Sequence, residues 1–193
     1  MKQLLLATVL SGCSISLHAA QAIFAGGCFW CMEADFEKLP GVSEVVSGYI
    51  DGHVDSPSYA EVSKGSTGHT EAVRIAYDPE QVSYEQLLDH FWVNTDPTVD
   101  DRQFCDVGSQ YRPGIYTLDE AQQQAALASR QAIVEAGKVS PIKVPVERAD
   151  RFWVAEDYHQ DYYKTHELRY RYYRFSCGRD ARLEQLWGKP AKQ

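Results

Sequence analysis

Residues 22–41 read AIFAGGCFWCMEADFEKLPG, and the predicted domain is built around this segment. Its first four residues are apolar and predict a short β-strand, and the glycine pair that follows predicts a tight turn. Apolar side chains then recur at spacings of three, four and three residues, which predicts an amphipathic helix that ends at Pro40-Gly41. They belong to Phe29, Met32, Phe36 and Leu39. The stretch is therefore a strand, a turn and a helix, with Cys28 at the turn.

Further elements extend this unit into a single α+β domain. Strands are predicted at 42–49, 72–77, 114–116 and 142–146. Ser83 with Gln86 and Thr117 with Glu120 form capping boxes, which predict two helices. The order strand-helix-strand-strand-helix-strand is the split β-α-β pattern, so we expect a ferredoxin-like two-layer sandwich. For the Tyr-rich C-terminus we expect an irregular extension.

The composition is that of one globular domain. The chain has 193 residues, of which 44% are hydrophobic, and this length buries a core without help from disulfides or metals. Its formal net charge of −8 offers no basic field for a polyanion, which argues against nucleic acid as a partner. Five cysteines at uneven spacings do not form a disulfide scaffold, so each thiol is judged singly.

The first 21 residues predict an export segment that precedes the domain at 22–193. Lys2 is the only charged residue before Glu33. Residues 4–10 form an apolar run of the length found in signal peptides, and this run is too short to span a bilayer.

Two cleavage sites compete within this segment. The sequence LSGC at 10–13 resembles a bacterial lipobox, which would place a lipid on Cys13, whereas AQA at 20–22 fits the small-x-small rule of ordinary signal peptidase. We favour the lipobox because a cut after Ala22 would remove the start of the first strand. We therefore expect an exported, periplasmic and lipid-anchored protein whose only membrane contact is that anchor. An uncleaved cytoplasmic tail is the alternative.

Cys28 is a candidate for chemistry from its position alone. At the start of a helix, unpaired backbone amides and the positive end of the helix dipole favour a thiolate, which predicts a lowered pKa for Cys28. The glycines at 26 and 27 let a ligand approach the backbone beside the thiol. A buried structural thiol is the alternative. Two long loops, 51–68 and 95–113, also suggest binding or catalysis.

Four short motifs, in order along the chain, carry a resemblance to a known family. They are GCFWCME at 27–33, SGY at 47–49, GHTE at 68–71 and DVGSQYR at 106–112. Together they resemble the A-type peptide methionine sulfoxide reductases, over a match that runs from about residue 23 into the C-terminus. The resemblance implies reduction of the S epimer of methionine sulfoxide, free or in oxidised proteins and peptides, without a metal or another cofactor.

Sulfoxide reduction needs a thiolate to attack sulfur, an acid to protonate the oxygen and an apolar seat for the methyl group. By resemblance, Cys28 is the nucleophile that becomes a sulfenic acid, and Glu71 is the acid, whose pKa burial must raise. The matching substrate-binding residues are Phe29, Trp30, Tyr59, Asp106 and Tyr111. Core packing for Phe29 and Trp30 and a solvated strand edge for Glu71 are the alternatives.

The thiol that resolves the sulfenic acid is left open between Cys177 and Cys31. The resemblance places the resolving thiol in the C-terminal segment that holds Cys177. We expect Cys177 to form the first disulfide with Cys28, because Gly178 and a segment without a helical pattern leave it free to move. Cys31 departs from the commonest family pattern, and Cys105 has no assigned role. The reductant would be thioredoxin in the cytoplasm or a thioredoxin-fold carrier in the periplasm, and we expect a monomer.

A second function class fits part of the pattern. Cys28 and Cys31 form a C-x-x-C at a helix start after a strand, as in thioredoxin-like disulfide oxidoreductases. That interpretation leaves Glu71 and Asp106 without a role. A structural zinc module built from four of the cysteines is weaker still, because the chain holds only one C-x-x-C pair.

Overall fold

The computed structural model describes residues 19–188, so the segment with Cys13 lies outside the described part. Six strands form a mixed sheet and two more form a small hairpin. The sheet strands are β1 (Ala20–Ala25), β2 (Val42–Ile50), β3 (Thr70–Tyr77), β6 (Gly114–Thr117), β7 (Val146–Arg148) and β8 (Trp153–Val154), and the hairpin strands are β4 (Arg102–Gln103) and β5 (Asp106–Val107). The helices are α1 (Phe29–Phe36), α2 (Tyr59–Val62), α3 (Tyr84–Val93), α4 (Glu120–Ala136), α5 (Tyr162–Thr165), α6 (Glu167–Ser176) and α7 (Arg179–Trp187).

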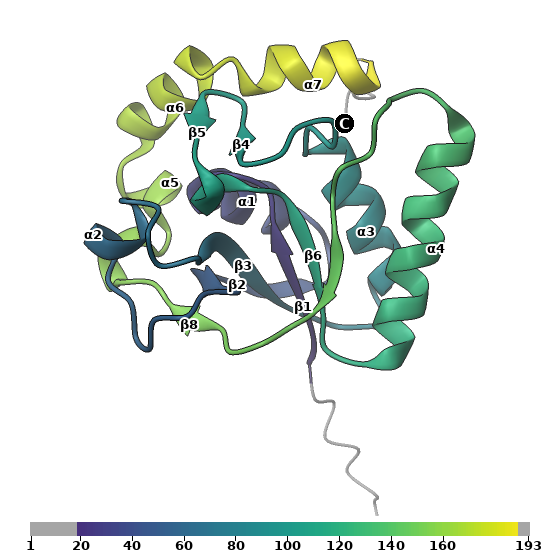
Figure 1. The fold of residues 1–193 in the computed structure, drawn as a ribbon, viewed down its shortest axis with the longest axis horizontal. Coiled ribbons are helices and arrows are strands. Elements are labelled where there is room, and N and C mark those ends of the chain that lie inside the picture. Colours follow the sequence, from purple (N-terminus) through teal and green to yellow (C-terminus); the bar gives the residue numbers. More distant parts are fainter. Residues whose placement is uncertain (1–18, 189–193) are drawn as a thin grey trace, which may run out of the picture.

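The sheet has the order β7-β6-β1-β3-β2-β8. Its four central strands, β6, β1, β3 and β2, pair with their neighbours in antiparallel fashion, and β7 adds to β6 in parallel. In Figure 1, α4 flanks the sheet on the right, while α6 and α7 run along the top. The fold is therefore α+β with a mixed sheet, as the sequence predicts. None of the helices in residues 19–188 is long and apolar enough to cross a membrane.

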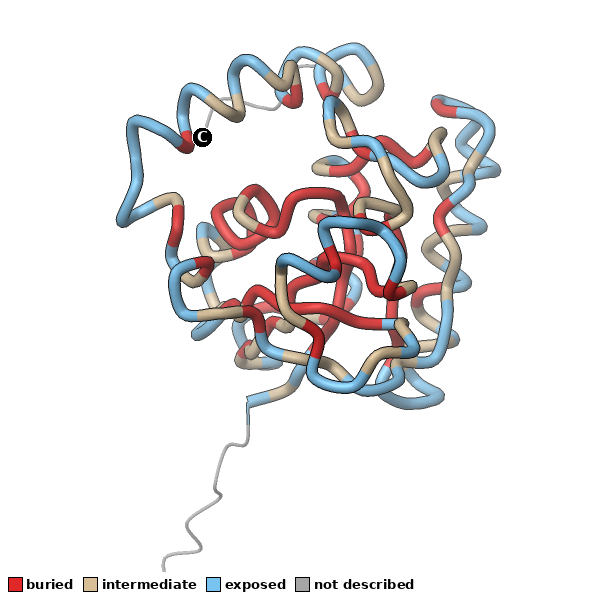
Figure 2. Tube along the Cα trace, turned by 60° about the vertical axis from the view of Figure 1, so that its left-hand side comes forward, coloured by how far each residue is buried: buried red, intermediate tan, exposed pale blue. Residues whose placement is uncertain are grey.

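The main core lies between the central strands and α1 and α3. Phe24 of β1 stacks on Phe36 of α1 and on Phe91 of α3, with ring centroids 5.4 and 5.3 Å apart. These three side chains and Met32 are fully buried, and each contributes roughly 1.5–3 kcal/mol of stability by leaving water. Figure 2 shows the buried segments gathered in the centre of the molecule. The apolar spacing noted at the first helix is thus the spacing that fills this core.

One predicted capping box is confirmed and the other is wrong. The Ser83 hydroxyl accepts the Gln86 N–H at 3.2 Å, and the Gln86 side chain accepts the Ser83 N–H at 2.8 Å. At the second helix, Thr117 is the last residue of β6, and its hydroxyl donates to the Glu147 carbonyl across the sheet. Asp119 caps α4 instead, because its carboxylate accepts the Gln122 N–H at 2.8 Å.

The last predicted strand begins later than expected, at Val146 instead of residue 142. Pro141 and Pro145 have no N–H to donate, and the Lys143 N–H donates to the Pro97 carbonyl in a loop. Only after Pro145 does the chain pair with β6. The expectation of an edge position for this strand is confirmed, because β7 ends the sheet.

The expected irregular C-terminal extension is wrong, because α5, α6 and α7 follow β8. These helices bury few apolar side chains, chiefly Tyr162, Tyr170 and Leu183. Tyr162 and Tyr170 pack with Cys31 and Ala34 of α1. Aromatic contacts and charge pairs hold α5, α6 and α7 in place. These helices therefore need no apolar stripe, which is the signal by which a helix is recognised in a sequence.

Asp35 ties α1 to the C-terminal helices. Its carboxylate is 3% exposed and accepts two hydrogen bonds of 3.0 Å from Arg174 of α6. Arg179 of α7, itself 2% exposed, lies 3.6 Å from the same carboxylate. Burial alone would raise the pKa of Asp35, but Arg174 and Arg179 outweigh it and hold that pKa below its usual value. The carboxylate is therefore charged at neutral pH.

We expect Asp35→Asn to destabilise the fold by about 3–5 kcal/mol, because it leaves the buried Arg179 guanidinium without a counter-charge. Urea unfolding followed by circular dichroism measures the loss. Glu167→Gln is the matched control, because the Glu167–Arg171 pair is exposed on both sides and should contribute about 0–1 kcal/mol. A loss at Asp35 no greater than the control would contradict this account.

Candidate active site

Cys28 lies at the N-terminal end of α1, where its carbonyl accepts the N–H groups of Cys31 and Met32 at 3.1 and 3.3 Å. The turn before it needs glycine. Gly27 has φ of +84°, and a Cβ there would lie 2.5 Å from Cβ of Gln103. The backbone therefore runs close against the loop 95–113 beside the thiol. This is the strand-turn-helix geometry that the sequence predicts.

A small cavity of about 70 Å³ opens beside Cys28. Its lining residues are Cys28, Phe29, Trp30, Tyr59, Glu71, Asp106, Tyr111 and Tyr173. The structure thus brings together all seven residues expected to act on or bind the substrate, from α1, β3 and both long loops. Cys31 and Cys177, the two candidate resolving thiols, do not line it. The cavity has the size of a methyl sulfoxide group and a few water molecules.

Tyr173 is a cavity residue that the sequence pattern does not reveal. Its hydroxyl donates to Oδ2 of Asp106 at 2.5 Å. The hydrogen bond joins α6 to β5 across the cavity wall. In the sequence Tyr173 is one of six tyrosines in the C-terminal segment, and nothing in their spacing singles it out.

His159 packs against the aromatic residues that line the cavity, and the sequence pattern does not reveal this residue either. Its Nδ1 accepts the Trp30 Nε1–H at 3.1 Å, and its ring lies 4.9 Å from Phe29 and 4.4 Å from Tyr59, centroid to centroid. Burial lowers the pKa of His159, so the ring is neutral at pH 7. Trp30 also stacks on Tyr162 at 3.8 Å. One imidazole thus contacts three of the residues that line the cavity.

The cysteines fall into two pairs. Cys105 and Cys177 form a disulfide, whereas Cys28 and Cys31 are free and buried. The expected Cys28–Cys177 bond is absent from this state and stays a prediction. The zinc module loses two of its four ligands, because sulfurs in a disulfide are not thiolates. The disulfide-oxidoreductase interpretation is weakened, since Cys28 is 7% exposed and Cys31 2%, too buried to reach a protein disulfide.

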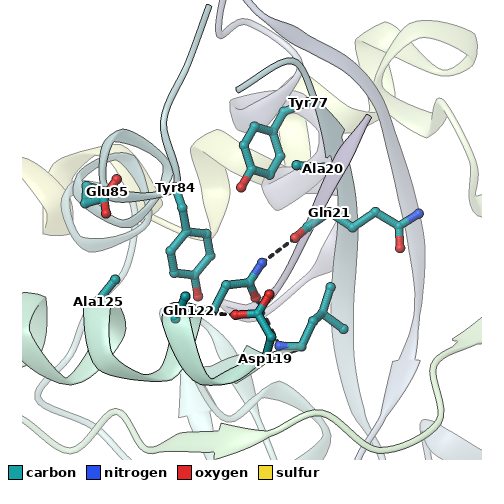
Figure 3. Close-up of a pocket in the computed structure, with 10 residues that line it drawn as sticks. Ala20, Gln21, Tyr77, Tyr84, Glu85, Asp119, Gln122 and Ala125 are labelled. Carbon is teal, nitrogen blue, oxygen red and sulfur yellow. Dashed lines mark hydrogen bonds between the residues drawn. The ribbon is translucent and has the colours of Figure 1, made fainter. Parts of the chain in front are cut away.

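A larger hollow of about 360 Å³ lies elsewhere, where the start of β1 and the end of β3 meet the starts of α3 and α4. Figure 3 shows Tyr77, Tyr84, Glu85, Asp119 and Gln122 around it. The Gln122 amide donates to the Gln21 carbonyl at 2.6 Å. No cysteine or other strong nucleophile lines this hollow. We therefore place the chemistry in the cavity beside Cys28, although that cavity is the smaller of the two.

Comparison with known proteins agrees with this placement. The family model for peptide methionine sulfoxide reductase matches residues 20–191. The chain belongs to the peptide methionine sulfoxide reductase family. It is 50% identical over 171 residues to peptide methionine sulfoxide reductase MsrA 2 of Rhizobium meliloti, with 88% of this chain and 84% of that one covered. It is 48% identical over 176 residues to the MsrA/MsrB protein of Vibrio cholerae, covering 91% of this chain but only 47% of that longer protein.

Two solved structures of Mxr1 share the fold. Mxr1 from Saccharomyces cerevisiae in reduced form superposes with a TM-score of 0.74 at 28% identity, over 79% of this chain and 88% of that one. Mxr1 in complex with Trx2 superposes with a TM-score of 0.55 at 19% identity, over 76% of this chain and 86% of that one. The activity of the chain is accordingly the reduction of methionine sulfoxide.

Glu71 has the protonation that a methionine sulfoxide reductase needs in its acid. The carboxyl is 2% exposed and accepts the Phe29 N–H at 3.0 Å. Burial is the main cause that raises the pKa of Glu71 to about 8. The hydrogen bond from the Phe29 N–H lowers this pKa, and the charge of Asp106 raises it further. At neutral pH the group is therefore mostly a neutral acid with a proton to give.

The predicted lowering of the Cys28 pKa is wrong for this state. Burial raises the pKa of Cys28, and the hydrogen bond with Cys31 and the nearby carboxyls of Glu71 and Asp106 act in the same direction. The hydrogen bond with Cys28 lowers the pKa of Cys31, with help from Arg179 and Arg174. The helix start favours a thiolate at Cys28, but burial and the two nearby acids oppose it. The resting thiol is therefore protonated.

We expect Glu71→Gln to become more stable relative to wild type as the pH rises from about 5 to about 8. In that window native Glu71 keeps a proton that the unfolded chain has lost, so the wild type loses up to about 1.4 kcal/mol of unfolding free energy per pH unit from this group. Glutamine does not titrate. Urea unfolding of both proteins across this window measures the difference, with Glu44→Gln, at an exposed position of β2, as the control. Parallel curves for wild type and Glu71→Gln would show that Glu71 is ionised at neutral pH.

Proposed function

We propose that the chain reduces the S epimer of methionine sulfoxide, free or in oxidised proteins and peptides, with Cys28 as nucleophile and Glu71 as acid. The observation that carries this proposal is the small cavity that a thiol, a neutral carboxylic acid and aromatic side chains line together. Phe29 and Trp30 seat the methyl group. A monomer is the proposed active form.

The reaction transfers the sulfoxide oxygen to Cys28. The Cys28 sulfur attacks the substrate sulfur while Glu71 gives a proton to the oxygen, and the products are methionine and a Cys28 sulfenic acid. Burial raises the pKa of Tyr59 to about 12 and raises that of Tyr111 as well, so both hydroxyls keep the protons with which they bind the oxygen. The Cys177 thiol then condenses with the sulfenic acid, and water leaves as a Cys28–Cys177 disulfide forms.

We expect Cys28→Ser to abolish sulfoxide reduction and Glu71→Gln to slow it by about 10²–10⁴-fold, the usual range for a positioned acid. A methyl p-tolyl sulfoxide assay with dithiothreitol measures both rates, and circular dichroism checks that the variants fold. Cys28→Ser activity above about a hundredth of the wild-type rate would contradict the assignment of the nucleophile.

A thioredoxin-type dithiol is the proposed reductant. Mxr1, a member of the same fold, has been solved in complex with Trx2, and this supports a thioredoxin-fold partner here. In a periplasmic setting the partner would be an exported thioredoxin-fold carrier. The proposed reaction requires no metal or other cofactor, since thiols supply both electrons.

Export with lipidation at Cys13 is proposed for the first 21 residues, ahead of a reductase domain at 22–193. The pairing of β1 supports the lipobox, because Ala20 and Ala22 lie opposite Tyr77 and Ile75 of β3. A cut after Ala22 would remove half of a central strand, whereas a cut before Cys13 leaves β1 whole. A split β-α-β core of ferredoxin-like type is proposed for the domain, supported by the order β6-β1-β3-β2.

Detergent-phase partitioning of the protein from its native cell tests the anchor. We expect the wild type in the detergent phase with a lipid on Cys13, and Cys13→Ala in the aqueous phase. A full-length, unmodified protein that retains Lys2 would contradict both cleavage sites.

A further inference from the structure

The SGY motif at 47–49 supplies no residue to the cavity, but it fixes the chain that follows β8. Gly48 pairs with β8, and a Cβ on Gly48 would overlap the Trp153 carbonyl oxygen. Only glycine therefore lets β8 approach β2 this closely. Beside it, the Ser47 carbonyl accepts the Ala155 N–H at 3.0 Å. The motif thus determines where the chain leaves the sheet after β8.

Glu156, the next residue along the chain, bridges two elements that are distant in the sequence. Its Oε2 accepts the hydroxyl of Tyr49, the last residue of the motif, at 2.8 Å. Its Oε1 accepts the Tyr59 N–H, also at 2.8 Å. Tyr49 is fully buried in β2, and Tyr59 is the first residue of α2. One carboxylate therefore ties the start of α2 to the central sheet.

Tyr59 is the residue on which this bridge acts. Its side chain lines the cavity with Cys28, and its hydroxyl is one of the two proposed to bind the sulfoxide oxygen. The N–H groups in the first turn of a helix have no partner within the helix, so they are free to bond elsewhere. By accepting the Tyr59 N–H, Glu156 fixes the backbone from which this hydroxyl projects.

The Glu156 carboxylate is suited to hold these groups and not to touch the substrate. It does not line the cavity. Burial alone would raise its pKa, but the hydrogen bonds from the Tyr59 N–H and the Tyr49 hydroxyl outweigh burial and hold the pKa of Glu156 below its usual value. At neutral pH it is therefore an ionised acceptor, and hydrogen bonds to an ionised group are the stronger kind.

We propose that Glu156 is a positioning residue for sulfoxide binding: held by Tyr49, it sets the place of the Tyr59 hydroxyl in the cavity. The inference rests on the proposed function, in which that hydroxyl binds the sulfoxide oxygen. It gives the SGY motif a part in the reaction, since Tyr49 holds the carboxylate in place.

Steady-state kinetics on methyl p-tolyl sulfoxide with dithiothreitol test this role through kcat/KM for the sulfoxide, which reports binding and attack at sulfur. Glu156→Ala leaves the Tyr59 N–H without its partner, so we expect kcat/KM to fall roughly 10-fold. Glu156→Gln keeps an acceptor for that N–H and an amide that can donate to the Tyr49 hydroxyl, so it should stay within about twofold of wild type. Tyr49→Phe removes only one of the two bonds and should lie between them.

A double-mutant cycle separates positioning from a merely structural role. Tyr59→Phe alone should lower kcat/KM roughly 10-fold, because a hydrogen bond to the oxygen is lost. In that background no hydroxyl remains to be positioned, so adding Glu156→Ala should cost less than about twofold. A structural role would cost the same factor with and without the Tyr59 hydroxyl. If Glu156→Ala does not fold, Tyr49→Phe takes its place in the cycle.

Tyr163→Phe is the matched control. The Tyr163 hydroxyl donates to Glu37, so this variant also removes a hydrogen bond from a tyrosine to a glutamate. Neither residue lines the cavity. The control should keep the wild-type kcat/KM, and circular dichroism checks that every variant folds.

The outcomes distinguish the inference from the function on which it rests. An unchanged kcat/KM in Glu156→Ala, or the same loss with and without the Tyr59 hydroxyl, overturns the inference while the proposed function stands. Glu156→Gln as slow as Glu156→Ala also overturns it, because the hydrogen bond is then not what matters. A wild-type rate in Tyr59→Phe would instead show that the proposed function assigns the wrong role to Tyr59.

Discussion

The two buried ion pairs that Asp35 forms with Arg174 and Arg179 fix the helices around the site. Asp35 belongs to the helix that begins at Cys28, whereas Arg174 and Arg179 flank Cys177 on both sides. A buried carboxylate is tolerated only when cations meet it, so α1 fixes where α6 and α7 lie. Tyr173 and the disulfide take their places beside the cavity as a result. The same contact that stabilises the fold therefore positions the redox chemistry.

Burial sets the chemistry of the cavity in two opposing ways. It makes Glu71 a proton donor at neutral pH, which sulfoxide reduction requires, and it also raises the pKa of Cys28, which opposes thiolate formation. The Cys28 thiol and the Glu71 carboxylic acid are both neutral, and this suits an uncharged sulfoxide. Proton movement can then accompany substrate binding instead of preceding it.

The local parts of the fold and site could be predicted from the sequence, and the long-range parts could not. The apolar spacing from Phe29 to Phe36 and the Ser83 capping box are signals within one element, and both are confirmed, although α1 ends at Phe36 and not at the predicted Pro40-Gly41. The C-terminal helices, His159 and Tyr173 depend on contacts across more than sixty residues with α1 and β5. Polar partners have no periodicity, so no pattern along the chain reveals them.

The cavity's small volume limits what can reach Cys28. About 70 Å³ holds the end of a methionine sulfoxide side chain but not the active-site loop of another protein. An oxidised sulfur at Cys28 is therefore beyond the reach of a macromolecular reductant. Gln103 fixes the loop beside the thiol, because it packs against Gly27 while its amide hydrogen-bonds the backbone of Asp96 at both ends. Another thiol of the chain itself must then resolve the oxidised Cys28, in the intramolecular disulfide that the reaction forms.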